Sequence, residues 1–118
     1  MSLSMDQIAE AFCRHRFDLT YPYMADEIKW TTVGNEELMG REAVIDRCDR
    51  SAKFLETVST TFTRLKMNRA ESFVVVESAA QFQDQDHQIS SVASCDVFQF
   101  SDGRIVEITS YVIELNQP

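Results

Sequence analysis

The side chain most able to do chemistry is Asp96, which directly precedes alternating aromatic residues in the sequence DVFQF. In an extended strand, the two-residue alternation places Asp96 on one face with Val92, Ser94, Phe98 and Phe100. A carboxyl group in apolar, water-poor surroundings is held in its neutral form and can donate a hydrogen bond at neutral pH. The alternative is a carboxylate that is solvated or bonded to a neighbour on an ordinary sheet.

A second candidate is His15, which continues the apolar face formed by Ile8, Ala11 and Phe12 at helical spacing. An imidazole can take up or release a proton near pH 7, so His15 and Asp96 are a candidate acid–base dyad. The competing interpretation is a histidine at a helix end or at the border of the core, with a purely structural role.

The sequence indicates no metal or cofactor chemistry. The cysteines, Cys13, Cys48 and Cys95, are widely spaced and belong to no CxxC pair or His cluster, so neither a zinc site nor a disulfide framework is predicted. We therefore expect any reaction to proceed without a cofactor and without a metal.

The charge balance restricts the partners. The formal net charge is −8, with 19 acidic and 11 basic residues, and this charge repels phosphate backbones and anionic membranes. The longest apolar runs are far shorter than the roughly 20 residues of a membrane span, and the N-terminus has no basic-then-apolar secretion pattern. We expect a cytoplasmic protein that binds neither nucleic acid nor membranes.

The elements that must position these residues change type near the middle of the chain. The first half predicts a helix capped by Ser4, a short element in YPYMADE with Pro22 in its first turn, a strand over residues 28–33, a turn over 34–37 and a helix over 41–57. The second half predicts four strands, in the sequences STTFTRLKMNR, SFVVVESAAQFQ, QISSVASCDVFQFS and RIVEITSYVIEL. Helices followed by a meander of strands predict an α+β fold, with the helices on one face of a curled sheet.

In the order and spacing of these elements, the chain resembles the nuclear transport factor 2-like superfamily, in particular its SnoaL-like and ketosteroid-isomerase-like members. The resemblance covers nearly the whole chain, so a single domain over residues 4–118 is expected. It is carried by the opening amphipathic helix and by the sequences YPYMADEIKW, MGREAVIDRC and DVFQFSDGRIVEITSYV. It implies a cone-shaped antiparallel sheet, wrapped around about three N-terminal helices and holding a central cavity.

The resemblance implies only part of a catalytic site. Asp96 matches the acid that ketosteroid-isomerase-like relatives keep protonated as a donor to an oxyanion. The general base of those relatives is replaced by Thr31 or Thr32, and their catalytic tyrosine on the first helix is replaced by Phe12. Glu114 is offset by one residue from the acid that ends the last strand of SnoaL-like cyclases, and this offset points it to the opposite face.

The predicted ligand contacts are mostly apolar and come from the first helix, the segment after it and three strands: Phe12, Tyr23, Trp30, Thr32, Phe98, Ile108 and Ser110. Two functions stay open. The first is a cofactor-free isomerase, cyclase or dehydratase acting on an apolar carbonyl or polycyclic substrate. The second is a non-catalytic module for binding a small apolar ligand or for dimerisation. The face that carries Cys95, Val97, Gln99 and Tyr111 is apolar enough to need cover. The resemblance also implies a homodimer through the sheet.

Overall fold

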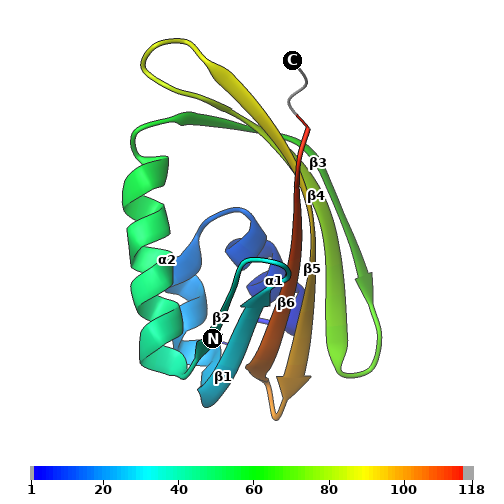
Figure 1. Ribbon diagram of the computed structural model, residues 1–118. Helices are drawn as coiled ribbons and strands as arrows, with labels where there is room; N and C mark the ends of the chain where they lie inside the picture. The colour runs from blue at the N-terminus through cyan, green and yellow to red at the C-terminus, as the bar shows by residue number, and fades with distance from the viewer. Residues whose placement is uncertain (1, 116–118) are drawn as a thin grey trace.

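The computed structural model describes residues 2–115, which form three helical segments and one six-stranded sheet (Figure 1). The last residues of the predicted domain, 116–118, lie outside the described residues. The elements in chain order are α1 (Met5–Cys13), the 3-10 helix η1 (Phe17–Tyr23), β1 (Met24–Thr32), β2 (Glu36–Met39), α2 (Arg41–Leu55), β3 (Ser59–Arg69), β4 (Phe73–Gln83), β5 (Ile89–Ser101) and β6 (Arg104–Glu114).

The predicted α+β cone is confirmed: the sheet curls around α1, which lies between α2 and the long strands (Figure 1). The strand order is β2-β1-β6-β5-β4-β3, and every neighbouring pair is antiparallel except β1 and β6, which run parallel. The sheet is therefore mixed and not wholly antiparallel. After β2, helix α2 connects to β3 at the far edge of the sheet. Three hairpins then lead through β4 and β5 to β6, which lies beside β1 and runs parallel to it.

Helix α1 begins where the sequence predicts but ends earlier. Ser4 Oγ accepts a hydrogen bond from Gln7 N at 3.2 Å, and Gln7 Oε1 accepts one from Ser4 N at 2.8 Å, which together form a capping box. The helix stops at Cys13, and His15 adopts a left-handed backbone with φ of 66°. His15 therefore lies beyond the helix and does not continue its apolar face.

The segment between the two helices differs from the prediction. The sequence YPYMADE forms no helix of its own, because Pro22 lies in the last turn of η1 and Met24 already starts β1. The strand begins early because Met24 and Ile28 are fully buried against the core. The expected turn over 34–37 lies at residues 33–35, and residues 36–39 form the short edge strand β2, which pairs with β1 and which the sequence pattern missed.

The core fills one end of the cone and leaves the other end open to a cavity. The residues of β4, β5 and β6 that face the helices are large and fully buried at one end, as Val74, Phe98 and Ile108 are. Further along the same faces the side chains become small or polar, as at Ser94 and Ser110. None of the helices within residues 2–115 is long and apolar enough to cross a membrane.

Candidate functional site

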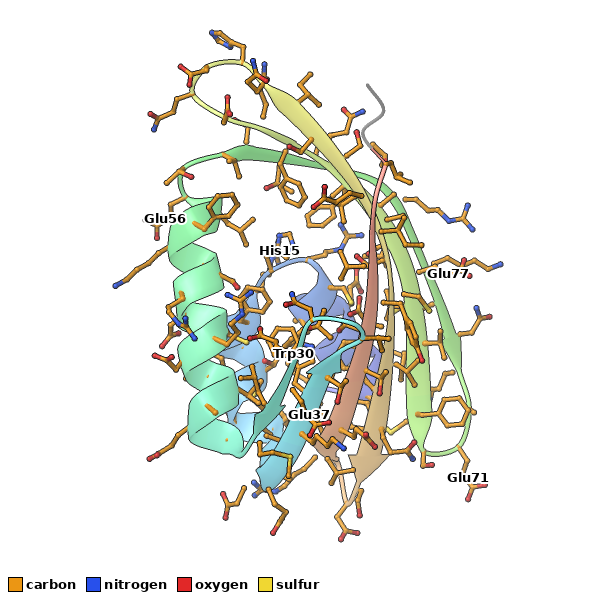
Figure 2. All side chains as sticks on the ribbon, viewed as in Figure 1. His15, Trp30, Glu37, Glu56, Glu71 and Glu77 are labelled. Atoms are coloured by element: carbon orange, nitrogen blue, oxygen red, sulfur yellow. The ribbon has the colours of Figure 1, made fainter. Side chains whose placement is uncertain are left out.

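A cavity of about 150 Å³ lies between the C-terminal end of α1, strand β1 and the concave face of β3 to β6. Six of the nine residues predicted for the site line it: Phe12, His15, Trp30, Thr32, Asp96 and Ser110. Figure 2 shows His15 at the end of α1, inside the curve of the sheet. The cavity thus brings together both candidate catalytic residues, which are separated by most of the chain.

Strand register places Asp96 on the cavity wall. On β5 it lies opposite Val76 of β4 and Ser110 of β6. The buried pair Phe98 and Ile108 lies two residues further along the same strands. The side chain of Asp96 faces the helices because the alternation of β5 is unbroken between Asp96 and Phe98. Only 9% of Asp96 is exposed to solvent.

The carboxyl group of Asp96 is held by neighbours on both sides. Its Oδ1 accepts a hydrogen bond from Ser110 Oγ at 2.5 Å, and its Oδ2 accepts a longer one from Cys13 Sγ at 3.7 Å. Ser110 Oγ in turn accepts from the indole Nε1 of Trp30 at 3.0 Å. The hydrogen bonds therefore link three neighbouring strands, β1, β6 and β5, to the end of α1.

Burial raises the pKa of Asp96 above its ordinary value, while the hydrogen bonds from Ser110 and Cys13 oppose the rise because they stabilise the carboxylate. Burial has the larger effect, and the neutral acid is favoured relative to an exposed aspartate. The pKa of Cys13 is raised by its own burial and by the neighbouring Asp96. Cys13 therefore stays a neutral thiol at pH 7 and is not an activated nucleophile.

His15 lies among aromatic rings at the cavity wall. The centroid of its imidazole is 5.2 Å from that of Phe62, 5.7 Å from that of Phe17 and 6.0 Å from that of Phe82. Burial lowers the pKa of His15 below its ordinary value, so the neutral imidazole is the favoured form at pH 7. A neutral imidazole has one nitrogen that can accept a proton, which is what a general base requires.

The other three predicted contacts lie outside the cavity wall. Phe98 and Ile108 are fully buried in the core, and the ring centroid of Phe12, which lines the cavity, is 5.4 Å from that of Phe98. Tyr23 packs at the border of the core, where its hydroxyl accepts a hydrogen bond from Leu3 N at 3.0 Å. These three residues therefore belong to the core or its border and do not line the cavity.

The sequence analysis missed several lining residues, among them Cys13, Phe17, Phe62 and Phe82. A signal existed for Phe82, since alternation along β4 puts it on the same face as Val76, which lies opposite Asp96. No comparable signal existed for Phe62, because the register of β3 shifts between Phe62 and Arg64.

The cavity wall, within the described residues, holds Asp96 as its one carboxyl group and His15 as its one imidazole. Thr32 lines the cavity and Thr31 does not; these are the two residues that the resemblance sets at the position of the ketosteroid-isomerase base. Glu114 is exposed and does not line the cavity. Over residues 2–115 there is no group of three side chains able to hold a metal ion. The protonated form of a buried acid can donate a hydrogen bond to an oxygen, and a neutral imidazole can take up a proton from a nearby atom.

A curled sheet wrapped around helices, with an acid and an imidazole in one small cavity, defines this chain as a cone-shaped α+β pocket protein. The chain belongs to the SnoaL-like domain family, which matches residues 5–108. A comparison with curated protein sequences finds no match.

Solved structures share the fold over most of the chain. A nuclear transport factor 2-like protein of unknown function from Cytophaga hutchinsonii is 28% identical, with a TM-score of 0.79 over 90% of this chain and 93% of that one. A proposed polyketide cyclase from Xanthomonas campestris is 17% identical, with a TM-score of 0.70 over 88% and 83%. An LEH-like epoxide hydrolase from M. tuberculosis is 17% identical, with a TM-score of 0.65 over 88% and 75%.

Proposed function

We propose that this protein binds a small, mostly apolar carbonyl compound in its cavity and transforms it without a cofactor, as an isomerase, cyclase or dehydratase does. The observation that carries the proposal is Asp96, a buried acid on the wall of an aromatic cavity that also contains His15. Neutral Asp96 would donate a hydrogen bond to the carbonyl oxygen, and His15 would take a proton from the adjacent carbon. The negative charge that develops on the oxygen is stabilised by the donor.

The size of the cavity favours a small substrate over a polycyclic one. An apolar cavity of about 150 Å³ in another protein holds a molecule the size of benzene, and the cavity here has a similar volume. A single ring with one carbonyl group fits that space, whereas a polycyclic compound would extend beyond it. Among proteins of this fold, the proposed polyketide cyclase and the epoxide hydrolase support a role on small molecules. We place this role in the cytoplasm, which the free thiols of the chain support.

The second candidate is a non-catalytic module that binds the same kind of ligand. It is favoured by one observation: Thr32 lines the cavity and cannot take up a proton at neutral pH. The resemblance sets Thr31 or Thr32 at the position where ketosteroid isomerases carry a carboxylate base. In this reading the imidazole of His15 packs against the surrounding rings and transfers no proton. The two candidates agree on binding and differ on turnover.

Variants of Asp96 test both candidates with monocyclic ketones such as cyclohexenone and acetophenone. Calorimetry measures binding, and NMR measures exchange of the protons next to the carbonyl with deuterated water. We expect Asp96→Ala to weaken binding about tenfold, the scale of one hydrogen bond. Asp96→Asn keeps a donor and should bind nearly normally, but its exchange rate should fall by roughly 10² because an amide stabilises a developing oxyanion less well than an acid.

The matched control is Asp86→Asn, which changes an exposed carboxyl group in the turn between β4 and β5. This variant should bind and exchange like the wild type. Exchange that is unchanged in Asp96→Asn would overturn the catalytic proposal. Binding of the ketones without any exchange would establish the non-catalytic module, and the absence of binding by every ketone would overturn both.

A further inference from the structure

We infer that Trp30 and Ser110 are positioning residues which keep the proton of neutral Asp96 on Oδ2 and thereby select the oxygen that donates to a ligand. The inference deepens the proposed function and rests on it for its consequence, although the arrangement can be tested in the protein without ligand. The indole of Trp30 would then influence the acid through the hydroxyl group of Ser110, which lies between them.

The direction of the hydrogen bonds follows from what each group can do. An indole N–H is a donor only, so Ser110 Oγ must accept from Trp30 Nε1 across the 3.0 Å that separates them. The single hydroxyl proton of Ser110 is then donated to Asp96 Oδ1, at 2.5 Å. An oxygen that accepts this proton is not the one that carries the acid proton, so the proton of the neutral carboxyl group resides on Oδ2.

The opposite arrangement is disfavoured by burial. If Asp96 carried its proton on Oδ1 and donated to Ser110, the hydroxyl proton of Ser110 would need another acceptor. Within the described part of the chain, Asp96 is the group that accepts this proton. Ser110 is only 2% exposed, so water does not offer a ready alternative. A buried hydroxyl proton without an acceptor loses its hydrogen bond to water and gains none in return, which is unfavourable.

Oδ2 is free to serve a ligand because its present partner is weak. Cys13 Sγ lies 3.7 Å from Oδ2, and a thiol is a poor donor and a poor acceptor. Cys13 and Ser110 both line the cavity, so both carboxyl oxygens of Asp96 border it, and Oδ2 is the oxygen with the weaker partner. A carbonyl oxygen that enters the cavity can replace the thiol as the partner of Oδ2 while Oδ1 stays bonded to Ser110.

The backbone holds this arrangement in place. Asp96 and Ser110 are paired across β5 and β6, and Thr32 is paired with Ser110 across β1 and β6. Trp30 therefore reaches Ser110 from the neighbouring strand, two residues before Thr32 on the same face. Figure 2 shows Trp30 on β1, beside the cavity.

The test is a titration of Asp96 followed by the NMR signal of its carboxyl carbon in ligand-free protein. Ser110→Ala removes the donor to the carboxylate, so the pKa of Asp96 should rise above the wild-type value. Trp30→Phe leaves the hydroxyl but frees it to accept from neutral Asp96, so the pKa should rise here too. In Ser110→Ala, adding Trp30→Phe should cause no further rise, because the indole acts only through Ser110.

A purely structural role of Trp30 would give a different result. The rise caused by Trp30→Phe would then be absent, or would be equally large in the Ser110→Ala background, and either result overturns the inference. Ser110→Thr keeps the hydroxyl and should restore the wild-type titration. The chain has one Trp, so biosynthetic replacement with 3-benzothienylalanine removes the indole N–H at nearly constant volume. The resulting protein should show the rise in the pKa of Asp96 that is expected of Trp30→Phe. It provides the test if Trp30→Phe folds poorly.

Two other titratable side chains share the cavity with Asp96 in the described chain: Cys13 from α1 and His15 from the segment after it. Cys13 has a raised pKa and stays neutral during the titration, but His15 has a lowered pKa and can charge in the same range. The titrations are therefore repeated with His15→Asn, in which the rises should persist. Because no ligand is present, a failed inference is distinguishable from a failed catalytic proposal, which the exchange experiment measures.

Discussion

Asp96 is subject to two opposing effects. Burial at the cavity wall favours its neutral form, while the donors on its two oxygens, Ser110 and Cys13, favour the carboxylate. A carboxyl group without the donors would be a weaker acid, and one without the burial would be ionised at neutral pH. The combination suits a group that must donate a hydrogen bond to a neutral oxygen and then stabilise the charge that develops there.

The raised pKa of Asp96 predicts a pH-dependent cost to stability. The folded protein binds a proton that the unfolded chain releases near the ordinary value of 3.8, so the free energy of unfolding falls as the pH rises from that value through the raised folded pKa. Asp96→Asn resembles the neutral acid and escapes this loss. It should therefore be more stable than the wild type at neutral pH, with the difference vanishing below about pH 3.8.

Urea denaturation at a series of pH values measures this difference. His15 contributes in the opposite direction, because its lowered pKa removes stability as the pH falls below 6.5. That contribution is common to both proteins and cancels in their difference. Asp86→Asn, at an exposed position, should follow the wild type at every pH. A difference between Asp96→Asn and wild type that stays constant from acid to neutral pH would contradict the prediction.

At the scale of elements, the end of α1 determines where His15 points. The N–H of His15 donates to Phe12 O at 3.0 Å and that of Arg16 donates to Ala11 O at 2.8 Å. These bonds form a Schellman motif, whose left-handed residue is most often glycine. This left-handed conformation is less favourable for histidine than for glycine, because histidine has a Cβ atom. The conformation places the imidazole among the aromatic rings at the cavity wall.

A pair of substitutions separates the backbone cost from the role of the side chain. His15→Gly and His15→Ala both remove the imidazole and its ring contacts, but only alanine retains the left-handed penalty. We expect His15→Ala to be less stable than His15→Gly by about 1 kcal/mol, measured by urea denaturation. Equal stability would mean that the helix end rearranges in the variants. Both variants should lose the proton exchange expected of the wild type.

At the scale of the whole molecule, the convex face of the sheet carries a groove of about 240 Å³ whose surface is largely apolar. Ala79, Ala93 and Cys95 line it, together with Tyr111 and Ile113, which are 47% and 60% exposed. The ion pair between Arg64 and Glu77, at 3.1 Å, lies at the groove as well. We propose that a second copy of the chain covers this face, since a contiguous apolar face is a typical dimer interface.

Sedimentation measures this assembly directly. The wild type should be a dimer at micromolar concentration, and Tyr111→Glu should shift it to a monomer because the interface would bury a charge. Phe54→Glu is the matched control, since it places the same charge at an exposed aromatic position on α2 that does not line the groove. A wild type that sediments as a monomer, or two variants that behave alike, would contradict the proposed interface.

The local structure of this chain was largely predictable because it depends on neighbours in sequence. The four long strands were predicted to within one residue of their ends, and the Ser4 cap and the Arg41 start of α2 were predicted correctly. Asp102 and Gly103 both have positive φ in the last hairpin, as a tight turn between antiparallel strands requires. The two-residue period also placed Asp96 on the face of β5 that lines the cavity.

Only the tertiary structure decided which residues meet around Asp96. The sequence pattern specifies the period and the turns of each element, but the parallel pairing of β1 with β6 depends on how the elements assemble. That pairing brings Trp30 to Ser110 across 80 positions, and the packing of α1 brings Cys13 to Asp96 across 83. The left-handed backbone of His15 likewise depends on the end of α1. Periodicity carries no information about such distant contacts, because register and packing determine them.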